Sequence, residues 1–174
     1  MAEKSMVKKI VAEIESSLKN GNSITALMTA LTLPDICGKV EYGDTMPGKQ
    51  RYIHWFDSYI PHGFSPFFDQ PRGKNLPELS GEIVYLLRCS LLHEGSINIE
   101  KNKIKCIDNR FDYFALYNEP PNENDIYLTI LRRSPNSKAM IVGIRGLCMI
   151  LAKTASAYYD QYKEKFEEQE SLKE

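Results

Sequence analysis

Two side chains near the middle of the chain, Arg88 and His93, combine a permanent positive charge with a group that exchanges protons near neutral pH. The arginine guanidinium is a planar fork that suits a phosphate. A histidine in the last turn of a helix lies at the negative end of the helix dipole, which favours its protonated form. Together the two groups are a minimal set for cleaving RNA by attack of its own 2'-hydroxyl, without a metal.

The helix that must position both groups is bounded by its sequence. Ser80 is suited to the N-cap, Glu82 follows in the first turn, and Gly95 is placed to end the helix in the left-handed conformation. At about 100° per residue, one side of this helix is apolar and should face the core. That side consists of Ile83, Val84, Leu86, Leu87 and Leu91.

The opposite side of the same helix is semi-apolar, which is unusual for a surface in contact with solvent. It carries Tyr85, Cys89 and Leu92, with Arg88 on one flank and His93 on the other. Such a face suits another protein surface with a polar pocket between the two. We therefore expect a homodimer through this face.

The elements before this helix are predicted to be helical. Apolar spacing indicates a helix over 7–20 and a second from Ser23 to Pro34, followed by a loop or short continuation over 35–48. A third helix over 49–60 buries an aromatic stripe. Residues 61–78, with four prolines and three phenylalanines, are predicted to form an ordered long loop that brings Arg72 and Lys74.

The second half of the chain changes character. Short segments at 102–107, 112–117 and 125–131 are rich in residues that favour strands and predict a small antiparallel sheet. A long helix is expected over 138–169, with a frayed, charged tail over about 165–174. The predicted fold is thus a single, mostly α (α+β) domain over 1–174, a helical bundle with a β insert at about 102–132.

Composition limits the classes of function. With 22 basic and 23 acidic residues the formal net charge is −1, so any RNA contact needs a local patch, for which Arg51, Arg72 and Lys74 are the candidates. No apolar run of about 18 residues exists, and the first residues mix acids and bases, so we expect a cytoplasmic protein with no membrane contact. The four cysteines are widely spaced, which argues against a metal site and predicts buried, reduced thiols. No cofactor is expected.

The stretch "RCSLLHEG", at the end of a capped helix in a mostly helical domain, resembles the HEPN superfamily (higher eukaryote and prokaryote nucleotide-binding domains). The resemblance implies that Arg88 and His93 form the superfamily's arginine–histidine motif, which in its ribonuclease members meets the partner subunit's motif across a dimer. The position after the arginine, often polar in HEPN nucleases, is Cys89 here. The resemblance also implies a cognate antitoxin or another defence partner.

A longer resemblance covers most of the first hundred residues. "LTLPDICGKVE", "RYIHWFDSYI" and "LSGEIVYLLRCSLLHEGS" look like a family of small bacterial proteins without an established activity. This likeness implies a bacterial cytosolic protein. The likeness covers Asp35, Cys37, Arg51 and Trp55 together with the arginine–histidine pair.

The leading hypothesis is a metal-independent endoribonuclease cutting single-stranded RNA, with Asp35, Tyr85 and Cys89 supporting Arg88 and His93. One alternative is a catalytically silent module that binds a nucleotide, an RNA or a protein. In a purely structural alternative, Arg88 pairs with Asp35 or Glu41 to hold the second helix while His93 caps its own helix. In a third, Cys89 acts as a thiolate beside the imidazole.

Overall fold

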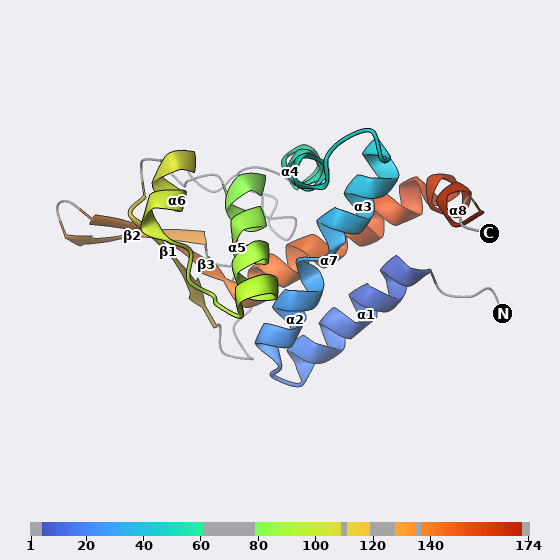
Figure 1. The fold of residues 1–174 in the computed structure, drawn as a ribbon. Coiled ribbons are helices and arrows are strands. Elements are labelled where there is room, and N and C mark those ends of the chain that lie inside the picture. The colour runs from blue at the N-terminus through green and yellow to red at the C-terminus, as the bar shows by residue number, and fades with distance from the viewer. Residues whose placement is uncertain (1–4, 61–78, 109–110, 119–127, 135–136, 172–174) are drawn as a thin grey trace.

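The fold is described from a computed structural model, which covers residues 5–60, 79–108, 111–118, 128–134 and 137–171. These residues are mostly helical, as predicted, with a small sheet in the second half of the chain, before the last two helices (Figure 1). The helices are α1 (Met6–Lys19), α2 (Ser23–Ala30), α3 (Leu33–Tyr42), α4 (Gly48–Tyr59), α5 (Gly81–Glu94), α6 (Lys101–Ile107), α7 (Ile144–Gln161) and α8 (Lys163–Ser171). Among the described residues, none of these helices is long and apolar enough to cross a membrane.

The predictions for α1 and α4 are confirmed. Between them, a single helix ending at Pro34 and a loop or short continuation over 35–48 were predicted, whereas the structure has two helices. α2 ends at Ala30, and Pro34 belongs to the first turn of α3, where its missing N–H has no partner to lose. Gly38, in the stretch 35–48, lies where α3 crosses α4 closely. A Cβ at this position would lie 2.8 Å from the carbonyl oxygen of Arg51.

The sheet is mixed, so the prediction of an antiparallel sheet is wrong for one of its two strand pairs. Its strands are β1 (Tyr113–Tyr117), β2 (Leu128–Ser134) and β3 (Ser137–Gly143), in the order β1-β3-β2. β2 pairs with β3 antiparallel, whereas β1 runs parallel to β3, with Phe114 opposite Met140. Residues 102–107, predicted as a strand, form most of α6.

The long helix predicted over 138–169 is divided into three elements. Its first residues form β3, the helix α7 begins only at Ile144, and α8 follows a break at Tyr162. The tail predicted to fray from about residue 165 is helical as far as Ser171, and its Phe166 is buried. Residues 172–174, together with the predicted loop over 61–78, lie outside the described residues.

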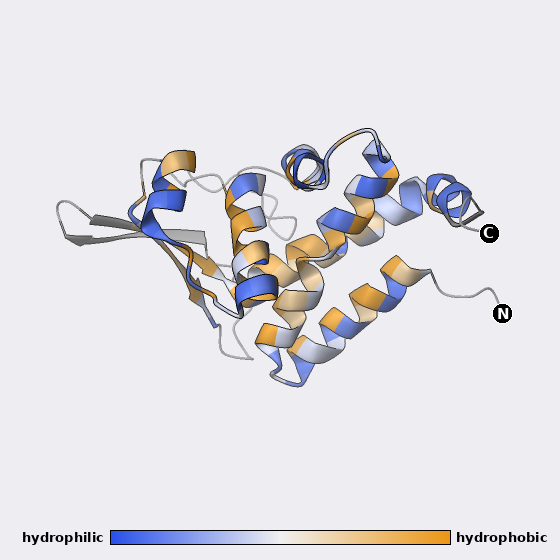
Figure 2. Cartoon of the chain, viewed as in Figure 1, coloured by the Kyte–Doolittle hydropathy of each residue, from blue (hydrophilic) through white to orange (hydrophobic). Residues whose placement is uncertain are grey.

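The core lies around α7, which runs through the middle of the molecule and contacts α1, α2 and α3 (Figure 1). Figure 2 shows hydrophobic residues where α1, α2 and α7 come together, whereas α8 is largely hydrophilic. The largest fully buried side chains include the predicted aromatic stripe of α4, with Tyr52, Trp55 and Phe56. α4 also contacts α5, so the same packing fixes the position of the helix that carries Arg88 and His93.

Candidate functional site

Both ends of α5 are formed by the residues that the sequence indicated. The Ser80 hydroxyl accepts a hydrogen bond from the backbone N–H of Ile83 at 3.4 Å, and Gly95 adopts the left-handed conformation with φ 65°. The Asp57 carboxylate of α4 accepts from the backbone N–H of Gly81 at 2.7 Å. α5 is therefore held by its own caps and by α4.

The two residues proposed for catalysis are in direct contact. Arg88 Nη1 lies 3.0 Å from His93 Nε2 at the C-terminal end of α5. Because an arginine can only donate, this hydrogen bond requires Nε2 to accept, with the ring proton on Nδ1. The helix dipole predicted a protonated ring, but the contact as it stands needs the neutral form.

Asp35 joins the pair from α3. Its Oδ2 accepts from Arg88 Nε at 2.8 Å, and the two side chains are only 20% (Arg88) and 33% (Asp35) exposed. Burial opposes the charge of Arg88, but the hydrogen bond and negative charge of Asp35 outweigh it, so the pKa of Arg88 is raised. Asp35 is one of the two partners predicted for this arginine.

Glu41, the other predicted partner, is engaged elsewhere. Its Oε2 accepts from the Tyr158 hydroxyl at 2.5 Å and from Lys165 Nζ at 2.8 Å. These contacts join α3 to α7 and α8. Arg88 is thus left to Asp35, and α5 is linked to the start of α3 instead of its end.

Tyr85 and Cys89 complete the group around Arg88. The guanidinium lies 5.8 Å from the centre of the Tyr85 ring, within the range of a cation–π contact. Burial and a hydrogen bond with Cys89 raise the pKa of Tyr85. Both side chains are half-buried in the single chain, and Leu92 beside them is half-buried too, whereas His93 is exposed.

Two aromatic or basic residues near this group were not predicted to belong to it. Lys49, at the start of α4, has its Nζ 6.0 Å from the centre of the Tyr85 ring. Tyr52 packs edge-on against the same ring at 5.3 Å, and its fully buried hydroxyl makes no hydrogen bond within the part of the chain described. Burial and the nearby charge of Asp35 raise the pKa of Tyr52. The sequence did contain one signal for Tyr52, because a tyrosine in a buried aromatic stripe carries a hydroxyl that a phenylalanine would not.

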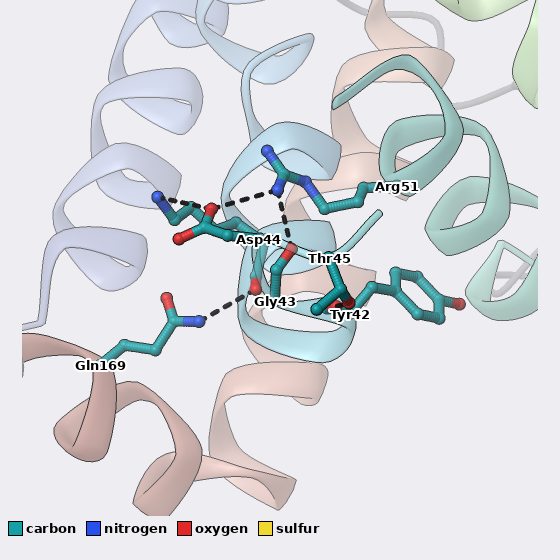
Figure 3. Close-up of polar contacts among 7 residues, drawn as sticks. Tyr42, Gly43, Asp44, Thr45, Arg51 and Gln169 are labelled. Atoms are coloured by element: carbon teal, nitrogen blue, oxygen red, sulfur yellow. Dashed lines mark hydrogen bonds and ion pairs between the residues drawn. The ribbon is translucent and has the colours of Figure 1, made fainter. Parts of the chain in front are cut away.

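The predicted phosphate contacts do not gather at this group. Arg51 lies in the first turn of α4, and its side chain reaches back to the turn between α3 and α4, where Nη1 donates to the Gly43 carbonyl at 2.7 Å and contacts Asp44 at 3.3 Å (Figure 3). Arg72 and Lys74 lie outside the described residues. Lys49 is an additional cation near the Tyr85 ring, which Arg88 also contacts.

The cysteines differ more than expected. Cys37 and Cys148 are buried, Cys89 is half-buried and Cys106 is exposed, and all four are free thiols. Burial raises the pKa of Cys37, which keeps it an unreactive thiol. Within the ranges given above, no three histidine, cysteine, aspartate or glutamate side chains form a group that could hold a metal ion.

Comparisons with protein family models, with curated proteins and with solved structures found no match to this chain. The HEPN resemblance therefore stays a prediction, and the function must be argued from the group around Arg88.

Proposed function

We propose that the protein is a metal-independent endoribonuclease that cuts single-stranded RNA. The observation that carries the proposal is the 3.0 Å contact between Arg88 Nη1 and His93 Nε2, which places a phosphate-binding fork and a proton-transfer group at one point of the surface. The HEPN resemblance adds support, because the same two residues form its motif. In this proposal the protein is cytoplasmic and works against RNA, alone or under a cognate antitoxin.

The chemistry follows from the functional groups. His93 Nε2 takes the proton of the RNA 2'-hydroxyl, whose oxygen attacks the adjacent phosphorus, while the guanidinium of Arg88 stabilises the charge on the non-bridging oxygens. The bond to the 5'-oxygen breaks, and this oxygen takes up a proton. The products are a 2',3'-cyclic phosphate and a 5'-hydroxyl. His93 Nε2 becomes free to accept the 2'-hydroxyl proton when Arg88 turns from the imidazole to the phosphate.

The proposal includes a homodimer through the face formed by Tyr85, Cys89 and Leu92. These side chains are half-buried in one chain, so a second copy could cover them at small desolvation cost. A two-fold axis through this face would bring two copies of Arg88 and His93 together. One histidine could then accept the 2'-hydroxyl proton and the other protonate the leaving oxygen.

The test is cleavage of single-stranded RNA by purified protein in excess EDTA, with the ends of the products analysed. We expect 2',3'-cyclic phosphate ends and no cleavage of DNA. His93→Ala and Arg88→Ala should each lower the rate about a hundredfold or more. His54→Ala is the matched control, because His54 is an exposed histidine on α4. Cooperative thermal melts would show that the fold is intact, with a midpoint lowered by a few degrees in Arg88→Ala because its bond to Asp35 is lost. Unchanged cleavage by His93→Ala would refute the proposal.

A second candidate, a catalytically silent module that binds a nucleotide, an RNA or a protein, is favoured by a different observation. Arg88 already has Asp35 at 2.8 Å and His93 at 3.0 Å, so two nitrogens of its guanidinium are engaged within the chain. A silent module would bind labelled RNA or nucleotide without releasing products. Binding that is lost in Arg88→Ala, with no cleavage by the wild type, would favour this candidate.

A further inference from the structure

A cavity of about 440 Å³ lies between the start of α1, α3 and the C-terminal helices. Much of its wall is apolar and comes from four helices, with Met6, Ile36, Val40, Tyr159 and Phe166. Cavities of this size hold small organic ligands in many proteins. An apolar ring system or a short alkyl chain would fit such a wall.

Two cations, Lys39 and Arg51, belong to the same cavity and meet at one point. Lys39 Nζ lies 3.2 Å and Arg51 Nη1 3.3 Å from the same oxygen, Oδ1 of Asp44 (Figure 3). The Arg51 guanidinium is held in place by its 2.7 Å bond to the Gly43 carbonyl. The two cations are therefore arranged for one anionic oxygen.

The Asp44 carboxylate, which lies between the two cations, is mostly exposed to solvent. Its side chain is 80% exposed, whereas that of Arg51 is only 18% exposed. The hydrogen bond and charge of Lys39, followed by the charge of Arg51, lower the pKa of Asp44. An exposed carboxylate on a turn can move into solvent and be replaced by the anionic group of a ligand.

The two acids that line the cavity have cations of their own. Asp35 is bound by Arg88 at 2.8 Å, and Glu167 lies 3.6 Å from Lys163. Their charges are thus partly compensated. Lys39 and Arg51 have Asp44 as their shared counterion, so displacing Asp44 leaves two cations for the incoming group.

We propose that this cavity is a binding site for a small amphipathic anion, whose apolar body lies against α1, α3 and α8 and whose carboxylate, sulfonate or phosphate group replaces Asp44 between Lys39 and Arg51. The proposal does not rest on the proposed RNA chemistry, although Asp35, which binds Arg88, also lines the cavity. Its ligand class follows from the combination of an apolar wall with two converging cations.

The probe for the test is 1-anilinonaphthalene-8-sulfonate, followed by fluorescence titration of the full chain. We expect saturable binding to one site. Lys39→Gln and Arg51→Gln should each weaken binding about fivefold to tenfold, because each removes one charge-assisted contact. Asp44→Asn should tighten binding several-fold, because it removes the competing carboxylate. Lys103→Gln, a neutralised lysine on the distant α6, should leave the affinity unchanged.

Two further arms separate this site from general apolar adsorption. The uncharged analogue N-phenyl-1-naphthylamine should bind more weakly and should not respond to Asp44→Asn. Val40→Trp should fill the cavity and abolish binding of the sulfonate. Arg51→Gln loses the bond to Gly43 and could unfold the turn, so Lys39→Gln, whose side chain is 43% exposed, provides the independent measurement. Equal affinities of wild type, Lys39→Gln and Asp44→Asn would overturn the proposal.

Discussion

The ion pair between Asp35 and Arg88 should stabilise the junction of α3 and α5 by a measurable amount. The contact is a charge-assisted hydrogen bond of 2.8 Å between side chains that are 33% and 20% exposed. Such bonds contribute about 1.5–3 kcal/mol when shielded, and partial exposure reduces this. We expect Asp35→Asn to lower the free energy of unfolding by about 1.5 kcal/mol. In a chain of this length the thermal midpoint should fall by about 3–6 °C.

A double-mutant cycle isolates the pair from other effects of each substitution. Urea unfolding of wild type, Asp35→Asn, Arg88→Gln and the double variant should give a coupling free energy of about 1 kcal/mol, which decreases at high salt. The matched control is the pair of Lys8 and Asp160, 2.6 Å apart, in which Asp160 is 63% exposed. Its coupling should lie below about 0.5 kcal/mol. Additive effects of Asp35→Asn and Arg88→Gln would refute the assignment of this pair as a structural link.

Three further outcomes are expected. Burial opposes ionisation of Glu41, but the bonds from Lys165 and Tyr158 outweigh it and lower its pKa, so its contribution is present above the unfolded pKa of about 4.3 and is lost as the pH falls through the folded value. Urea unfolding at several pH values should therefore show Glu41→Gln to be less stable than wild type near neutral pH, by an amount that shrinks in acid; a difference independent of pH would contradict this. Gly38→Ala should cost about 1–3 kcal/mol, because the new Cβ would lie 2.8 Å from a backbone oxygen, whereas Gly48→Ala, with its nearest contact at 3.7 Å, should be tolerated in the same thermal melts; equal midpoints would argue against close packing of α3 on α4. Finally, if the proposed dimer forms, sedimentation should show Leu92→Asp to be monomeric, because an unpaired charge in an interface is costly; a monomeric wild type would remove the dimer.

Sequence patterns predicted most of the helices because their signals are local. Ser80 and Gly95 marked the ends of α5, and the apolar spacing of α1 and α4 matched the helical period. The pattern failed where one residue type serves two purposes. The glycines and the proline of 35–48 indicated a loop or a short continuation, but Gly38 lies within α3, where it allows α4 to approach.

The errors in the second half of the chain have a tertiary cause. Residues 138–143 are continuous in apolar character with α7, so a strand and a helix cannot be distinguished there without knowing that β1 and β2 flank them. The parallel pairing of β1 with β3 likewise joins segments that are not neighbours in the chain. Short-range patterns carry no information about such a partner.

At the candidate site, too, the sequence indicated the residues, whereas their pairing depends on tertiary contacts. The sequence offered Asp35 and Glu41 as partners of Arg88, and the fold decides between them, because Glu41 faces Tyr158 and Lys165. A spacing of five residues predicts Arg88 and His93 about 140° apart around the helix. Their contact depends on the length of the arginine side chain, which reaches the exposed imidazole along the surface.

The position of Asp35 gives the two sites a common element. Its carboxylate binds Arg88, and the same residue also forms part of the wall of the cavity between α1, α3 and α8. An anion bound in the cavity would therefore act on a carboxylate that holds the guanidinium of Arg88. By thermodynamic linkage, any effect of that anion on the bond between Asp35 and Arg88 would be matched by an equal effect of a phosphate at Arg88 on the affinity of the cavity. The first turn of α3 thus contributes to both proposed sites.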